Sequence, residues 1–121
     1  MTNFVPTITS ESPGFTTSSI VFEYMRVGKL MFISGRFEIT DVGTSPNQRT
    51  VHFTLPNGFS CSGFVGSVGS IALNKTGVDI TKLSVRQGAN EFYIQEGAGG
   101  SNVLPVIGTG YVMLHATIML N

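Results

Sequence analysis

A strict alternation of apolar and other side chains runs through residues 111–120, near the end of the chain. Because successive side chains of a β-strand point to opposite faces of the sheet, this period of two predicts a strand with one buried face. At about 3.3 Å per residue it would reach about 33 Å, which is long for a strand. Its predicted buried members are Val112, Leu114, Ala116, Ile118 and Leu120.

Seven further segments are predicted to be strands, with turn-forming residues between them. Residues 30–40 have the strongest pattern, in which Ile33, Gly35 and Phe37 share one face. Along residues 78–86 the residues expected to be buried shift from one set of alternate positions to the other, which predicts a bulge near Thr81 and Lys82. The seven predicted strands cover residues 20–24, 30–40, 49–55, 64–73, 78–86, 91–95 and 103–107.

Composition favours an all-β fold. Val, Ile, Thr, Phe and Tyr, which suit strands, make up 46 of the 121 residues, whereas the helix formers Ala, Leu, Glu and Lys make up 19. Short strands at regular spacing favour an antiparallel β-sandwich of a jelly-roll-like type. We expect this sandwich over residues 20–121, preceded by an extended N-terminal arm over residues 1–19, which is polar and rich in turn formers.

Charge is low and balanced, and this excludes several classes of partner. Charged residues make up 12% of the chain, and Lys+Arg 7 against Asp+Glu 7 leaves no net charge. Nucleic acids and anionic membranes attract basic surfaces, so neither is expected as a partner. The N-terminus has no secretory signal pattern, which predicts synthesis in a cytoplasm. So few charges leave apolar surface exposed, and we therefore expect a homo-oligomer.

Catalytic, metal-ligating and cofactor-binding residues are not expected, and the chain is not predicted to be an enzyme. Its acidic residues are scattered without a close pair, and Cys61 has no second cysteine for a disulfide. Cys61 with His52 or His115 would form a nucleophile and base, but a small half-buried cysteine is the simpler interpretation. One alternative is a three-fold axis that gathers three copies of His115 around a metal.

Two segments are predicted to lie in subunit interfaces. The outward residues of the last strand include large side chains that are costly to expose to water. The strand therefore either has a mildly apolar outer surface or makes a subunit contact, and we favour the contact. The N-terminal arm is the second candidate, because it can reach a neighbour. The predicted interface residues are Phe4, Pro6, Ile8, Tyr111, Met113, His115 and Met119.

Three motifs carry a resemblance to a known family. They are Phe-Val-Pro-Thr-Ile at 4–8, Tyr-Met-Arg-Val-Gly-Lys-Leu-Met-Phe-Ile-Ser-Gly-Arg-Phe at 24–37, and Leu-Pro at 55–56. This pattern resembles a domain of tailed-bacteriophage virion proteins, which occurs in tail fibres, receptor-binding proteins and small head-surface proteins. The similarity covers residues 4–56, with a looser match in the closing strand. One departure is Phe4, where the family usually has Trp.

The resemblance implies a trimeric β-sandwich on the virion surface, made in the host bacterial cytoplasm. Because this 121-residue chain starts at Met1 without a fibre shaft, we expect a non-enzymatic protein that decorates and stabilises the capsid. Its partners would be its own copies and other virion proteins, chiefly the major capsid protein. The alternative is the receptor-binding tip of a tail fibre or baseplate, which recognises a host surface glycan or protein through loops 41–48 or 97–102.

Overall fold

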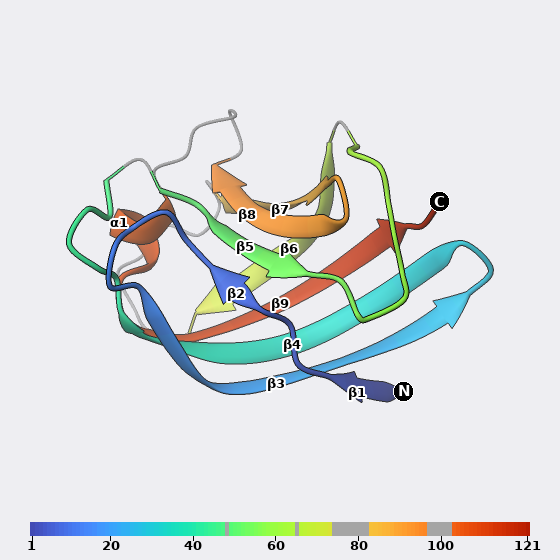
Figure 1. Cartoon of the computed structure of the whole chain (residues 1–121), viewed down its shortest axis with the longest axis horizontal. Helices are drawn as coiled ribbons and strands as arrows, with labels where there is room; N and C mark the ends of the chain where they lie inside the picture. Colours follow the sequence, from blue (N-terminus) through green and yellow to red (C-terminus); the bar gives the residue numbers. More distant parts are fainter. Residues whose placement is uncertain (48, 65, 74–82, 97–102) are drawn as a thin grey trace.

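The computed structural model describes residues 1–47, 49–64, 66–73, 83–96 and 103–121. Within these residues the chain forms nine strands and one short helix (Figure 1). In chain order they are β1 (Thr2–Phe4), β2 (Ile8–Thr9), β3 (Thr16–Val27), β4 (Leu30–Asp41), β5 (Val51–Thr54), β6 (Ser67–Leu73), β7 (Leu83–Gly88), β8 (Glu91–Glu96), α1 (Val103–Ile107) and β9 (Gly110–Met119).

The described strands form one sheet, in the order β1-β3-β4-β9-β6-β7-β8-β5-β2. Every pairing between neighbours is antiparallel, which confirms the all-β, antiparallel prediction. The last strand of the chain, β9, lies between β4 and β6. The sheet is continuous and curled, and the jelly-roll arrangement of two separate sheets stays a prediction.

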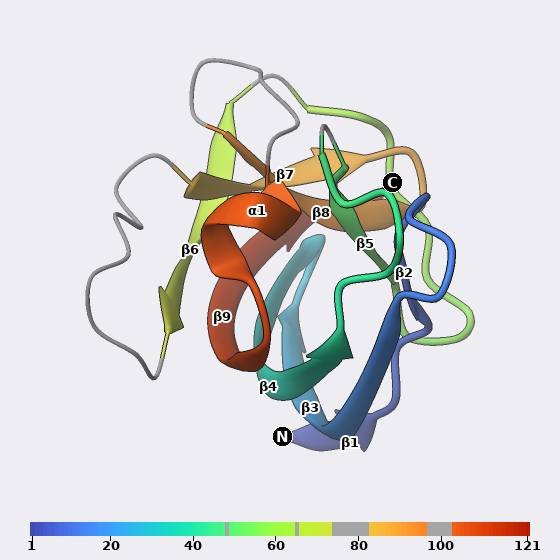
Figure 2. The ribbon, with the colours of Figure 1, turned by 90° about the vertical axis from the view of Figure 1, so that its left-hand side faces the viewer.

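The curl brings the two halves of the sheet face to face around the core (Figure 2). The Phe53 ring on β5 lies 5.9 Å from that of Phe22 on β3 and 5.3 Å from that of Phe37 on β4. It also stacks on Phe92 of the neighbouring strand β8, at 4.9 Å between ring centroids. All four rings are buried. These contacts place the core inside the curl, so the opposite faces of the strands point outward.

The N-terminal segment contributes the outermost strand at each end of the sheet. β1 pairs with β3, whereas β2, only a few residues further along, pairs with β5. Pro6 between them is buried. The segment predicted as an arm over residues 1–19 therefore contains both edge strands and the beginning of β3 at Thr16. It crosses from one end of the curled sheet to the other.

The prediction of a strand at residues 103–107 is wrong, because this segment is the helix α1. Val103, Leu104 and Ile107 are its buried residues, which is the spacing of one helix face. Pro105 does not break it, since an N–H in the first turn of a helix has no partner within the helix. The Gly108 N–H donates to the carbonyl of Leu104 at 2.7 Å and closes the turn.

A close approach between β6 and β9 requires a glycine. Gly69 pairs with Ala116 of β9. On the other side of β6, a bulge between Ser67 and Gly69 shifts the pairing with β7. A Cβ atom at Gly69 would overlap the backbone carbonyl of His115. The other bulge, predicted near Thr81 and Lys82, lies outside the described residues.

Candidate functional site

The candidate site is the outer face of β3, β4 and β9, the three long strands along the bottom of Figure 1. β4 pairs with β9 in continuous register from Leu30 opposite Met119 to Ile39 opposite Gly110. β3 joins β4 through a two-residue turn at Gly28 and Lys29. Because residues opposite each other in antiparallel strands share a face, the outward side chains form one continuous surface. We call this surface the outer face.

The outer face is unusually apolar for an exposed surface. Large apolar side chains on it are between 37% and 61% exposed. Three comparable side chains lie elsewhere in the described residues: Met1, Val5 and Phe64. Exposed apolar surface of this extent marks an interaction site in soluble proteins. The exposed apolar residues of the outer face are Val21, Met25, Val27, Leu30, Phe32, Tyr111, Met113 and Met119.

One end of the outer face continues into an apolar hollow of about 250 Å³. Leu30 and Met119 line it from the outer face, and Phe64 and Val68 line it from the neighbouring segment. Gln87 also lines the hollow, although its side chain is buried and bonded to the backbone. The hollow therefore extends the apolar surface from β4 and β9 toward the start of β6.

The middle of the outer face is polar. A second hollow, of about 320 Å³, lies over Ser34 and is lined by Glu23, Arg36 and His115. In the part of the chain that the structure describes, these three side chains make no hydrogen bond and no ion pair with one another or with other residues. Glu38, further along β4, accepts a hydrogen bond from the Ser18 hydroxyl at 3.1 Å. One carboxylate and one guanidinium thus stand unpaired within an apolar surface.

Four of the predicted interface residues, all on β9, lie on this face. Tyr111, Met113, His115 and Met119 are exposed and alternate with buried neighbours. Their position agrees with the predicted subunit contact, while the contact itself stays a prediction. The large share of this face that β3 and β4 contribute was not predicted from the sequence. A signal was present in the even-numbered residues of the predicted strand 30–40, which include Leu30 and Phe32.

The three predicted interface residues of the N-terminal segment pack on their own chain. The Phe4 ring lies 5.7 Å from the rings of both Phe22 and Tyr24. Pro6 is buried, and Ile8 is half-buried against the core. These side chains hold the edge strands in place, and their role between copies stays a prediction.

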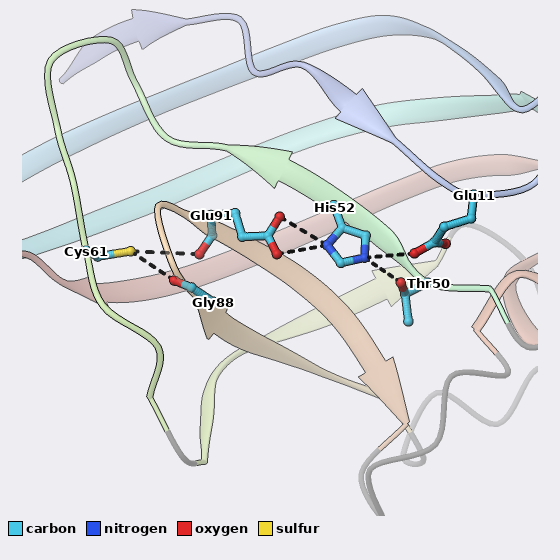
Figure 3. A network of polar contacts seen from close by, with 6 residues as sticks. All are labelled: Glu11, Thr50, His52, Cys61, Gly88 and Glu91. Atoms are coloured by element: carbon cyan, nitrogen blue, oxygen red, sulfur yellow. Dashed lines mark hydrogen bonds and ion pairs between the residues drawn. The ribbon is translucent and has the colours of Figure 1, made fainter.

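A polar cluster on the opposite half of the sheet centres on His52 (Figure 3). Its Nδ1 lies 3.1 Å from both carboxylate oxygens of Glu91, and its Nε2 lies 2.6 Å from the Thr50 hydroxyl. Glu11, next to β2, reaches within 3.5 Å of Nε2. The His52 ring also stacks on Tyr93 at 5.3 Å. This cluster was not predicted from the sequence, because its members come from three distant segments.

Cys61 is not paired with a base in the described structure. Its thiol is buried and donates to the carbonyl oxygen of Gly88 at 3.3 Å (Figure 3). Burial raises the pKa of the thiol, an effect larger than the opposing hydrogen bonds from the backbone at Asn90 and Glu91. No hydrogen bond joins this thiol to His52 among the described atoms. Such a cysteine is a poor nucleophile at neutral pH.

Over the described residues no group of three or more His, Cys, Asp or Glu side chains is placed to hold a metal ion. None of the described helices is long and apolar enough to cross a membrane. Comparison with models of protein families, with curated proteins and with solved structures found no match.

Proposed function

We propose that this chain is a non-enzymatic structural protein of a tailed-bacteriophage virion, a homotrimer that decorates and stabilises the capsid. The observation that carries the proposal is the exposed apolar outer face of β3, β4 and β9. The resemblance of residues 4–56 to phage virion proteins supports the viral setting. In this proposal the curled sheet is a variant of a jelly-roll-like sandwich, and the protein works on the virion surface after synthesis in the bacterial cytoplasm.

The size of the outer face supports assembly. A strand of ten to twelve residues is about 35 Å long, and three strands are about 14 Å wide, which gives a flat footprint of about 500 Å². The accessible area of the face is larger than this flat footprint, because side chains project from it and the hollow at Phe64 adjoins it. Stable protein interfaces bury about 800 Å² on each partner. The outer face is therefore of the right order for one subunit contact, and its apolar character favours burial.

A decoration protein stabilises a shell by binding its assembled form. Any ligand that binds the assembled state more tightly than its separate parts shifts the equilibrium toward assembly. The work of such a protein is packing against its own copies and against the major capsid protein.

Light scattering coupled to size exclusion tests the assembly. We expect the mass of three chains of 12.9 kDa each. Met25→Glu places a charge on the outer face and should give monomers, because a buried unpaired carboxylate is costly. Val5→Glu is the matched control, because Val5 is exposed but lies outside the outer face. A monomeric wild-type protein, or equal masses for all three, would contradict this use of the face. Purified protein should then bind bare capsids in a sedimentation assay.

The alternative is a receptor-binding tip that recognises a host surface glycan or protein. One observation favours it: the stacked rings of His52 and Tyr93 lie on the outward side of β5 and β8 and offer an aromatic surface. Of the two loops predicted for such a site, residues 97–102 and residue 48 lie outside the described residues. Binding to candidate host cells rather than to bare capsids would favour this function.

A further inference from the structure

We propose that Glu23 and Arg36 form ion pairs between neighbouring copies of the chain and thereby set the register of the assembly. This inference rests on the proposed use of the outer face as the subunit contact. The partner is another copy of the same chain, and these two charges of the face lack partners among the described residues of their own chain.

The outer face carries one unpaired acid and one unpaired permanent base. Glu23 lies on β3 opposite Ser34, and Arg36 lies two residues further along β4, opposite Val21. Both line the same hollow, beside His115 of β9. Glu38, the other carboxylate of this face, is already bonded to Ser18. If a second copy covers the face, both unpaired charges lose water, and a buried charge is tolerated when it gains an opposite charge.

Neighbouring copies of this chain supply both missing charges. In an assembly of identical subunits every contact is repeated by symmetry, so each copy brings a carboxylate to meet a guanidinium and a guanidinium to meet a carboxylate. An apolar surface alone allows two sheets to slide over each other with little change in energy. Complementary charges near its centre favour one register and oppose the others. The apolar ends of the outer face would supply the affinity.

Glu23 and Arg36 are also diagonal neighbours within one chain. Diagonal positions on adjacent strands are about 7–8 Å apart, a distance that long side chains can bridge. In the structure, Glu23 and Arg36 of the same chain form no ion pair. An experiment must nevertheless separate a pair within one chain from a pair between two chains, and mixing two variants does so.

Glu23→Arg and Arg36→Glu test the inference separately and together. Each single variant places like charges against each other at every contact, so the concentration needed for half-assembly should rise at least about tenfold. In a mixture, the new guanidinium at position 23 faces the new carboxylate at position 36 of the other variant. A mixed trimer has two such contacts and one contact between like charges, so assembly should return in part, as mixed trimers detected by native mass spectrometry. Lys29→Glu, in the exposed β3–β4 turn, is the control and should assemble normally.

Each outcome decides the proposal. Single variants that assemble like the wild type would overturn it. Single variants that dissociate and are restored only when both changes are in one chain would also overturn it, because the pair would then lie within that chain. Both results leave the proposed function standing, since the wild type still assembles. A monomeric wild-type protein would overturn the inference together with the use of the outer face. Circular dichroism confirms that each variant is folded.

Discussion

Replacing Gln87 by Met should destabilise the protein by about 3 kcal/mol. The side chain is 3% exposed, and its Nε2 donates to the carbonyl oxygens of Ser62 at 2.7 Å and Met119 at 2.9 Å. Its Oε1 accepts from the Met119 N–H at 2.9 Å. Each hydrogen bond contributes about 1 kcal/mol net, and Met, which has a similar unbranched shape, restores none of them. The end of β9, which carries Met119 to the outer face, would lose its attachment to β7.

Urea unfolding followed by circular dichroism measures this effect. With a slope of about 1–3 kcal/mol per molar, the midpoint should fall by about 1–3 M while the slope stays unchanged. All samples need the same protein concentration, because assembly adds to apparent stability. Ser70→Ala, on an exposed position of β6, is the control and should change little. A loss below about 1 kcal/mol for the Met variant would refute the reasoning, because water would then be satisfying the freed backbone groups.

Three further predictions follow from the fold and the polar cluster. Gly69→Ala should cost about 1–3 kcal/mol or more in urea unfolding, because its Cβ meets backbone, whereas Gly63→Ala, with nothing within 4 Å, should be tolerated. Burial raises the pKa of the Cys61 thiol, so a thiol reagent should label the native protein slowly at neutral pH and faster as the pH rises. Labelling should be rapid in urea, and equal rates for native and denatured protein would show that the thiol is accessible. His52→Phe keeps a ring to stack on Tyr93 but removes the polar contacts, and thermal unfolding should show a loss of about 1–2 kcal/mol; unchanged stability would mean that these contacts contribute nothing.

The strands that the sequence predicts best are those with one buried and one exposed face. Residues 30–40 and 111–120 alternate, and the structure has β4 and β9 there with one-residue differences at their ends. β3 extends further than predicted, from Thr16, because its first residues are polar on both sides. The chain there is irregular, with a register shift between Ser18 and Val21 and a left-handed backbone at Ser19. Alternation cannot identify such a strand.

The parts that could not be predicted depend on contacts between distant segments. Nothing local tells that Glu91 and Glu11 meet His52, since their meeting follows from the pairing of β5 with β8 and β2. The exposed apolar surface was predicted from β9 alone, because the neighbours of β9 were unknown. The error at residues 103–107 has a similar origin. A short apolar run is compatible with a strand or a helix, and burial of Val103, Leu104 and Ile107 decides for the helix.

The position of β9 in the middle of the sheet has a consequence for how the chain folds. Its pairing with β4 joins Ile39 to Gly110, two residues far apart along the chain, and its other edge holds β6. β4 and β6 each lack one of their two neighbours in the sheet until residues 110–119 have left the ribosome. Proteins dominated by such distant pairings fold slowly, in milliseconds to seconds. During that interval two open strand edges stand beside an apolar surface, so rapid synthesis should favour aggregation, and slower expression at low temperature should raise the soluble yield.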